Sequence, residues 1–542
     1  MRRKRVLWLG FAFALALAVA GSGVAATHKH HKKVVVTISI GAEPPSLDPG
    51  LATDTTSASV IANINDPIIR LSRTPALTPL HTGLAQSWTV HGTNVTLHLR
   101  HNDRWTNGKP VTAKDVVKSW MRTISPQLAA DYAYQFYGIK GAEAYNGCSK
   151  GCNKLKKKVG ISAPNKWTVK IKLVSPQPWF IQQLSHTSFI PYYMPAVTKW
   201  GNKWTEANHI VTDGPFKLTS WKHNASLTLV KNPKWRDAKS VKVDEVKLPI
   251  IVDAGTALNA YRANKLQIDT SGFNPTDIPT LKKTKDWHLT PNLGTYYYGF
   301  NVKNIKDVNE RKALAAAIDR HAIVKYIGQL GQVPAQTFTP FGIANYKQIT
   351  KKVGWLPIYG DDRPSGMEVA KSYMAKAKNP VMNFNLYINN SAGHIQIAQQ
   401  IQSNWQKLGV TVTIKTLEWA QYLQFLGPPP NSAVGAYRLG WLADYPEDYN
   451  FLSLWTCGSG NNNTNFCSKK FDNTMKKAEH TQNTAKRVAL YHKAEMILTG
   501  KNGAMPIAPI YFYVGAYLEK TNVTGYYQNP LGTDFFDQIR VK

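Results

Sequence analysis

The chain has 542 residues, of which 43% are hydrophobic, and a formal net charge of +33. This length exceeds what one hydrophobic core usually holds, so we expect two or three lobes that fold without help from a cofactor. Outside residues 2–5 and Lys154–Lys158, lysine and arginine are scattered singly or in pairs. The chain has no zinc-finger spacing and no aromatic RNA-binding signature, which argues against a nucleic-acid partner.

Residues 1–26 have the pattern of a secretory signal peptide. Basic residues at positions 2–5 precede the apolar run Val6–Ala20, and Val24-Ala25-Ala26 supplies the small residues of a cleavage site. The apolar run is too short for a comfortable membrane span, and no other segment reaches the roughly 18 uninterrupted apolar residues of a spanning helix. We therefore expect a soluble protein outside the cytoplasm.

The positive charge persists after export. Removing the four basic residues of the signal segment from +33 leaves +29. Diffuse charge of this kind favours attraction to an anionic wall or membrane surface, or adaptation of the exterior to an unusual medium. Both interpretations stay open at this point.

The four cysteines form two local pairs. Cys148 and Cys152 lie in one short loop, and Cys457 and Cys467 bracket a loop rich in asparagine and glycine. In an oxidising compartment this spacing favours two local disulfides among the three possible connectivities. A four-cysteine metal site would need the distant pairs to converge, and neither pair has the spacing of a zinc knuckle. We predict no bound metal and no cofactor.

Alternation of apolar and polar residues dominates the first half of the chain. The pattern predicts strands over residues 34–40, 94–100, 167–173 and within 213–230. Between them, Thr112 is expected to cap a helix whose start Asp115 favours. The apolar face of that helix comprises Val116, Val117, Trp120, Met121 and Ile124. The aromatic segment 132–137 fits core packing and a ligand-facing wall equally well.

Helical and strand patterns alternate in the second half. We predict helices over residues 257–264, 309–320 and 391–408, the last ending at Gly409, and strands over 266–269, 410–414 and 510–517. The chain shows no repeat and no long disordered linker. Strands and helices that interleave in two separate regions predict mixed α/β lobes.

The segment RLGWLADYPEDYNFL, residues 438–452, contains the strongest candidate site. It places Asp444 between Trp441 and Tyr445 after an apolar approach, where a charge is normally out of place. A loop carboxylate paired with a lysine is the competing interpretation. The string GCSKG at residues 147–151 fits GxSxG but lies in the short cysteine loop, without the strand-to-helix pattern of a nucleophile elbow. The chain has no HExxH helix and no phosphate-binding loop, so a secreted hydrolase or transferase has no nucleophile to name.

Four segments occur in an order that resembles a known family. They are residues 94–122, 213–221, 296–324 and 438–452, and together with the signal peptide they are similar to extracellular solute-binding proteins of peptide ABC importers, family 5. The resemblance covers nearly the whole mature chain. It implies an α/β fold of the periplasmic-binding-protein type II, a two-lobed clamp with an extra third domain.

The resemblance also implies a division of the chain. Lobe I would combine residues 27–69, 200–294 and 511–542, the added small domain would span 70–199, and lobe II would span 295–510. The chain would cross between the lobes twice. Residues that close the lobes are expected near 293–300 and 507–511.

The same resemblance assigns roles to particular residues. Asp444 corresponds to an aspartate that pairs with a ligand amine, and Arg438 to a cleft arginine that meets a carboxylate directly or through water. Gly440 would let the ligand backbone come close, and Trp441 would wall the amine pocket. The remaining expected ligand-binding residues are Tyr132 in the small domain, Tyr445 beside the carboxylate, and Asn274 in a loop along the ligand.

The implied function is binding without catalysis. A monomer would capture peptides between its lobes and deliver them to the membrane permease subunits of an ABC importer. Glu447 and Asp448 add two carboxylates beside the site, which could attract a cation or a more basic ligand. The same fold could therefore hold a metal chelate, a sugar or another cationic solute, and a secreted basic surface-binding protein is a further alternative.

Overall fold

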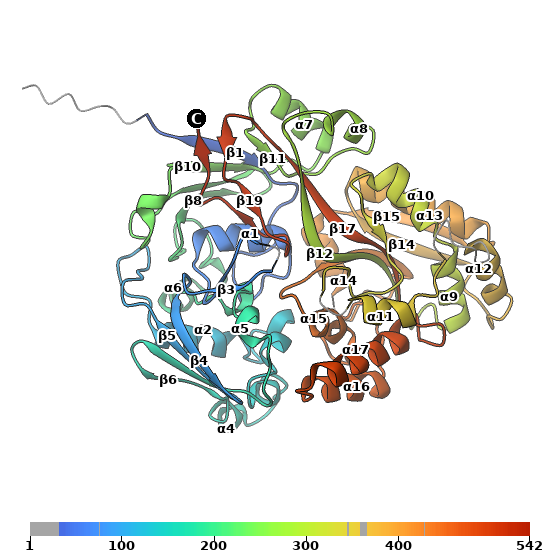
Figure 1. Cartoon of the computed structure of the whole chain (residues 1–542), viewed down its shortest axis with the longest axis horizontal. Coiled ribbons are helices and arrows are strands. Elements are labelled where there is room, and N and C mark those ends of the chain that lie inside the picture. The colour runs from blue at the N-terminus through green and yellow to red at the C-terminus, as the bar shows by residue number, and fades with distance from the viewer. Residues whose placement is uncertain (1–31, 75, 344–345, 358–365, 428) are drawn as a thin grey trace, which may run out of the picture. The chain divides into compact units, whose positions relative to one another are not determined.

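A computed structural model describes residues 32–542 apart from 75, 344–345, 358–365 and 428 (Figure 1). It separates Met1–Lys33 from one compact unit, Val34–Lys542, and the following paragraphs concern that unit. The predicted signal peptide lies outside the described residues. In the described part of the chain, every helix is too short or too polar to cross a membrane.

An 11-stranded mixed sheet forms the framework of the unit, in the order β15-β14-β16-β12-β17-β11-β1-β10-β9-β8, with β13 paired to β17. One half contains β1 (Val35–Ser39), β8 (Phe216–Lys222), β9 (Ser226–Lys231), β10 (Glu245–Pro249) and β11 (Ile268–Asp269). The other contains β12 (Trp287–Phe300), β13 (Val333–Pro334), β14 (Asn383–Asn389), β15 (Thr411–Leu417), β16 (Ala436–Leu442) and β17 (Ile507–Glu519).

Strands β12 and β17 connect the two halves of this sheet. They pair antiparallel along most of their lengths, but their register shifts between Pro291 and Thr295. Beyond that shift the end of β12 pairs with β16, whereas the end of β17 pairs with β11. Figure 1 shows both strands running from one group of strands to the other. The chain thus crosses between the two halves along two adjacent strands.

The tyrosines of β12 show how two cores share one strand. Tyr296 and Tyr298 pack into a core with helices α9 (Val308–Ala317) and α13 (Ala392–Gln406). Tyr297 points to the opposite face, into a core with α15 (Asp448–Leu452), α16 (Lys469–Glu479) and α17 (Thr484–Leu498). Alternate residues of a strand face opposite sides, so a sheet covered on both faces needs an uninterrupted apolar run.

A second, four-stranded sheet has a core of its own. Its order is β4 (Ala85–His91), β5 (Asn94–Leu99), β7 (Thr168–Lys172) and β6 (Ile161–Asn165). Helix α2 (Ala113–Thr123) covers it and begins with the predicted cap, in which the Thr112 amide donates to Asp115 across 2.8 Å. Trp120 of α2 is fully buried and donates to the Phe189 carbonyl. We call residues 68–211, which contain this core, the small-sheet region.

The remaining elements are short and surround these sheets. The helices are α1 (Thr55–Ile64), α3 (Ala142–Asn146), α4 (Cys152–Lys156), α5 (Phe180–Gln183), α6 (Met194–Trp200), α7 (Ala254–Arg262), α8 (Ile278–Leu281), α10 (Arg320–Ala322), α11 (Tyr346–Val353), α12 (Gly366–Met374) and α14 (Trp419–Leu426). The paired strands are β2 (Arg70–Leu71) with β3 (Pro79–Leu80), β18 (Val523–Thr524) with β21 (Arg540–Val541), and β19 (Tyr527–Gln528) with β20 (Asp534–Phe535).

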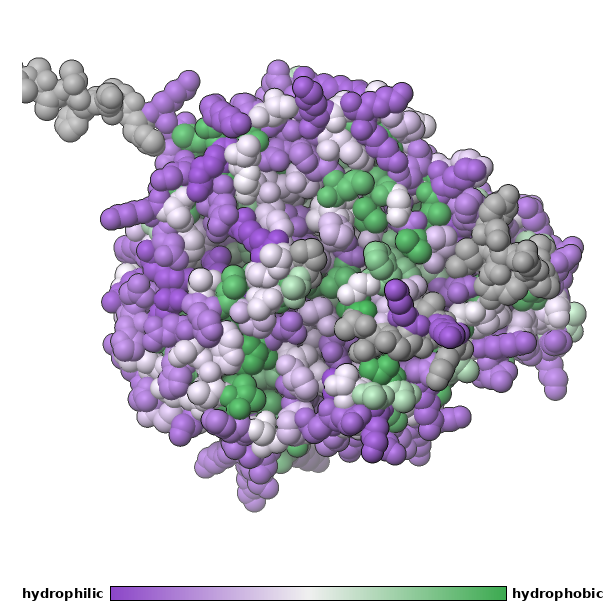
Figure 2. Space-filling model, viewed as in Figure 1, coloured by the Kyte–Doolittle hydropathy of each residue, from purple (hydrophilic) through white to green (hydrophobic). Residues whose placement is uncertain are grey.

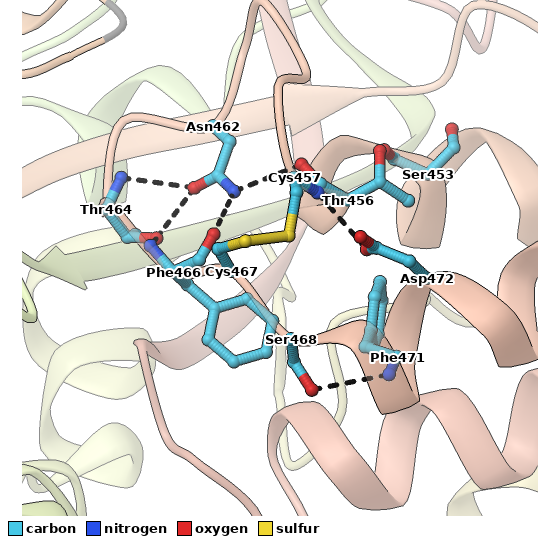
Figure 3. The surroundings of a disulfide bond; sticks show 10 residues. All are labelled: Ser453, Thr456, Cys457, Asn462, Thr464, Phe466, Cys467, Ser468, Phe471 and Asp472. Atoms are coloured by element: carbon cyan, nitrogen blue, oxygen red, sulfur yellow. Dashed lines mark hydrogen bonds between the residues drawn. A yellow bond between two sulfur atoms is a disulfide. The ribbon is translucent and has the colours of Figure 1, made fainter.

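Both predicted disulfides are present, Cys148–Cys152 and Cys457–Cys467. Figure 3 shows the second one at the base of the loop that it closes. Inside the loop the Asn462 side chain donates to the Phe466 carbonyl across 2.8 Å, and Asp472 accepts from the Cys457 amide across 3.1 Å. The bond therefore closes a loop that hydrogen bonds also hold, both within the loop and to Asp472 near the start of α16.

Candidate ligand-binding site

A cavity of about 1300 Å³ lies between the small-sheet region and the main sheet. Its wall includes every residue from Arg438 to Asp444, along β16 and its continuation. The other walls come from the start of α1, from residues 131–132 and 185–187 of the small-sheet region, from α14, and from Tyr513 of β17. This space exceeds the roughly 300–1,000 Å³ of ordinary small-molecule pockets.

Asp444 is buried, with 7% of its surface exposed, and polar groups surround its carboxylate. Asn450 donates to Oδ2 across 2.8 Å, and the amide of Gln135 donates to the same oxygen. His186 Nε2 lies 3.1 Å from Oδ1, and the Tyr132 hydroxyl donates to Oδ1 across a longer 3.4 Å. Each carboxylate oxygen thus has two neighbours, and Tyr132 is the weakest of the four.

These neighbours come from two distant parts of the chain. Tyr132 and Gln135 lie on the 3-10 helix Asp131–Phe136, and His186 precedes a second short 3-10 helix. Asn450 lies on α15 and also accepts from the Asp444 amide and from Trp441 Nε1, each across 3.0 Å. The small-sheet region therefore reaches across to a carboxylate that α15 and β16 hold in place.

The two ring nitrogens of His186 contact different groups. Nδ1 accepts from the backbone N–H of Ser188 across 3.3 Å and lies 3.0 Å from the Ser188 hydroxyl, and Nε2 faces Asp444. No lysine or arginine of the described residues forms an ion pair with Asp444. The contacts of the carboxylate come instead from Asn450, Gln135, His186 and Tyr132, unlike the lysine-paired loop residue of the competing interpretation.

Tyr132 and Trp441 form an aromatic wall next to this carboxylate. Their ring centroids lie 6.0 Å apart, and the Tyr132 ring lies 4.9 Å from that of His186. Burial raises the pKa of the Tyr132 hydroxyl well above its ordinary value, and the charge of Asp444 adds to the rise. Tyr132 therefore remains a proton donor beside Asp444 at every physiological pH.

Arg438 is the second charged residue of the wall segment 438–444, with 7% of its surface exposed. Its guanidinium donates to Asn389 across 3.0 Å and to the Tyr513 hydroxyl across 2.9 Å, and it lies 4.5 Å from the ring centroid of Tyr296. These partners are neutral, and Nε has no hydrogen-bond partner in the described structure. A buried cation with neutral neighbours is favourable only when an anion approaches it.

The structure explains Gly440 by a contact within the protein. A Cβ atom there would lie 2.1 Å from the Tyr513 hydroxyl, so the missing side chain gives room to the tyrosine that holds Arg438. Tyr445 is almost fully buried and is not part of the cavity wall. Asn274 accepts from the Asp277 amide near the start of α8, also away from the wall. The structure thus brings together Asp444, Trp441, Arg438, Gly440 and Tyr132, but not Tyr445 or Asn274.

The prediction that Glu447 and Asp448 add charge to the site is wrong. Glu447 accepts from the Tyr491 hydroxyl across 3.0 Å and lies 3.4 Å from Arg487 Nε, both on α17. Asp448 is fully buried at the start of α15. Neither residue is part of the cavity wall. Glu447 is paired within the protein and Asp448 is buried away from the wall, so Asp444 is the buried carboxylate of this segment that faces the cavity.

Comparisons with known proteins agree with this geometry. Residues 79–463 match the family described as bacterial extracellular solute-binding proteins, family 5. The chain is 33% identical to the oligopeptide-binding protein OppA of Bacillus subtilis, over 93% of this chain and 92% of that one. It is 34% identical to the periplasmic oligopeptide-binding protein OppA of Salmonella typhimurium, over 93% of this chain and 90% of that one.

Solved structures are similar over nearly the whole chain. The murein tripeptide-binding protein MppA of Escherichia coli matches with a TM-score of 0.85 and 27% identity, over 94% of this chain and 99% of that one. Haemophilus influenzae OppA in complex with the peptide RPPGFSPFR also gives 0.85, at 26% identity and the same coverage. An unliganded open form of MppA gives only 0.62, at 27% identity over 94% of this chain and 98% of that one. The described arrangement is thus less similar to the open form than to the other two structures.

Proposed function

Since the chain belongs to the bacterial extracellular solute-binding proteins of family 5, we propose that it captures peptides and delivers them to an ABC-importer permease. The predicted type II clamp fold is confirmed by the structural likeness, and the peptide would lie in the cavity between its lobes. The chain would act outside the cytoplasm as a monomer and would catalyse no reaction. The peptide-binding relatives support this proposal, and the cavity gives it a chemical basis.

The observation that carries the proposal is the buried Asp444 carboxylate, which faces the cavity and has no lysine or arginine partner among the described residues. A peptide ammonium would supply the missing cation, replacing the long contact from Tyr132 on Oδ1. Arg438 offers the complementary charge six positions earlier on the same wall. A dipolar ligand with separated ends, such as a peptide with free termini, matches these two charges better than a sugar or a metal chelate does.

The unpaired edge of β16 is a place where an extended ligand could bind. Strand β14 pairs with β16 only at Ala436 and Tyr437, so residues 439–442 have no strand partner on that side within the described structure. These residues line the cavity. An extended peptide could pair with their backbone groups as an added strand, which gives affinity that does not depend on side-chain identity.

A division into lobes accompanies the proposal. We place lobe I at residues 27–69, 200–294 and 511–542, the small domain at 70–199 and lobe II at 295–510. The register shift between Pro291 and Thr295 supports a hinge where β12 leaves the first lobe. Such a hinge would let the walls carrying Tyr132 and Asp444 separate when the ligand leaves.

The experiment that tests the proposal has two steps. Native mass spectrometry of protein purified without refolding should find a peptide mass carried in the cavity. Calorimetry should then show tight binding of a tripeptide with free termini and much weaker binding of its N-acetyl form, because acetylation removes the ammonium that pairs with Asp444. Equal affinity for both peptides would contradict the role of Asp444.

A specific surface favours a second partner, an anionic cell-envelope surface. Residues 138–174 contain nine lysines and one glutamate, and Lys150, Lys154, Lys156, Lys157 and Lys158 are all exposed beside the Cys148–Cys152 disulfide. No ion pair to a carboxylate is described for these lysines. Figure 2 shows hydrophilic residues at the end of the unit where α4 lies in Figure 1. Each lysine near an anionic membrane contributes about 1 kcal/mol, so salt-sensitive binding to anionic vesicles would test this partner.

A further inference from the structure

Trp179 joins the small-sheet region to lobe II away from the cavity. It lies immediately before α5, and its ring stacks on Tyr449 of α15 with centroids 5.4 Å apart and an interplanar angle of 20°. The guanidinium of Arg487, on α17, lies 5.5 Å from the same ring. Only 3% of the Trp179 surface is exposed. One aromatic side chain is thus enclosed by groups from the opposite side of the cleft.

Hydrogen bonds accompany this stack. The Gln177 amide donates to Glu479 Oε1 across 2.7 Å, and the Ser175 hydroxyl donates to the Glu479 carbonyl across 3.2 Å. In the other direction Gln482 donates to the Pro176 carbonyl across 2.7 Å. We call the group formed by Ser175, Gln177 and Trp179 with Tyr449, Glu479, Gln482 and Arg487 the clasp.

The clasp is preorganised on both sides. Gly138 has no side chain where a Cβ atom would lie 2.3 Å from the Gln177 amide oxygen, so the small-sheet region makes room for the side chain that reaches Glu479. Arg487 donates to the carbonyls of Thr481 and Gln482 and lies 3.4 Å from Glu447. The charge of Glu447, which the sequence suggested for the ligand, thus helps to orient the cation over Trp179.

We propose that the clasp holds the two sides of the cleft together, and thereby sets the affinity and the release rate of the ligand without touching it. None of the clasp residues lines the cavity. Yet the small-sheet region that carries Trp179 also carries Tyr132, Gln135 and His186, the donors that reach Asp444. Separation of the two sides would therefore break the clasp and dismantle the carboxylate site in one movement.

The proposal rests on the proposed function and makes it quantitative. The apparent dissociation constant of a ligand rises as the fraction of protein in the binding-competent form falls. An aromatic stack and a desolvated cation–π contact are both lost when the tryptophan ring is removed. We expect roughly tenfold to hundredfold weaker peptide binding in Trp179→Ala, with the change mainly in the dissociation rate.

The test compares three variants of the full mature protein. Trp179→Ala should bind a free-termini tripeptide more weakly, dissociate faster in stopped-flow measurements, and show a larger radius of gyration by small-angle scattering without peptide. Trp179→Phe keeps a ring for Tyr449 and should restore most of the affinity. Trp200→Ala is the matched control, because Trp200 lies in the same region, is 39% exposed and stacks on His209. It should behave like the wild type.

The outcomes separate the two proposals. Wild-type affinity and radius in Trp179→Ala would overturn the clasp while leaving peptide binding intact. If the wild type binds no peptide but Trp179→Ala has a larger radius of gyration than the wild type, the proposal of peptide capture would be overturned and the proposal of the clasp would stand. If Trp179→Ala does not fold, Gln177→Ala removes the contact to Glu479 alone and should produce the same changes to a smaller extent. An unchanged radius and affinity in that variant would overturn the clasp.

Discussion

His186 Nε2 lies 3.1 Å from Oδ1 of Asp444, so a residue of the small-sheet region reaches the carboxylate that faces the cavity. The amide of Ser188 donates to the other ring nitrogen, Nδ1, across 3.3 Å and helps to orient the ring. No lysine or arginine of the described residues pairs with Asp444. A cationic ligand would therefore meet this carboxylate without competition from a lysine or arginine side chain.

Replacement of His186 by lysine should place a permanent cation of the protein beside the Asp444 carboxylate. The Lys side chain would carry a permanent ammonium to Asp444 and compete with the ligand amine. We expect calorimetry to show roughly tenfold to hundredfold weaker binding of a free-termini tripeptide, equivalent to about 1.4–2.8 kcal/mol. His186→Gln supplies an uncharged donor and is the control, with an affinity close to wild type. If His186→Lys and His186→Gln bind the tripeptide equally well, a ligand amine does not pair with Asp444.

Replacement of Asp444 by asparagine should remove the discrimination between free and acetylated amino termini. The ligand ammonium would be buried without a partner, which costs roughly 3–5 kcal/mol in affinity. Asp131→Asn is the matched control, because Asp131 also lines the cavity but is exposed at its edge. Calorimetry with the free and the acetylated peptide should give equal affinities only for Asp444→Asn. A retained preference of that variant for the free amine would refute the assignment.

The fold was largely predictable from local patterns, and the differences have tertiary causes. Strand β17 begins at Ile507, earlier than the predicted 510, although Pro509 argues against an interior strand. The register of β12 with β17 shifts where Pro509 pairs, and a shift of this kind accommodates a proline. Helix α9 ends at Ala317, before the predicted 320. There the buried Arg320 donates to the Ala315, Ile318, Ala335 and Pro509 carbonyls, contacts that no local pattern contains.

The site was predictable only in the part that one segment encodes. Asp444, Trp441 and Arg438 lie close in sequence, so the unusual carboxylate identified their neighbourhood. Gln135 and His186 reach Asp444 from short 3-10 turns of the small-sheet region, and polar residues in such turns carry no periodic signal. Asn450 is nearer, yet only the fold shows that its side chain links Trp441 to Asp444.

Replacement of Arg438 by glutamine should weaken binding of peptides with a free carboxyl terminus and spare their amides. A charge-assisted hydrogen bond contributes roughly 1.5–3 kcal/mol, so the loss should be about tenfold to hundredfold for a free-termini tripeptide. The thermal midpoint without peptide should not fall, because the variant removes a buried cation whose described partners are neutral. A lowered midpoint with unchanged peptide preference would instead indicate a structural role for Arg438.

Glu495 should make the protein less stable as pH rises from about 4.5 to about 6. This carboxyl is fully buried on α17, and burial raises its pKa from 4.5 to about 6, opposed by hydrogen bonds from the Phe338 amide and Thr499. The folded state thus holds the proton longer than the unfolded state, so deprotonation costs stability across that window, by about 2 kcal/mol in total. Glu495→Gln stays neutral and should show a smaller fall in thermal midpoint between pH 4.5 and pH 7 than the wild type does. Glu143→Gln, at an exposed site, should retain the wild-type profile, and an identical profile in Glu495→Gln would show that this buried carboxyl does not titrate in the window.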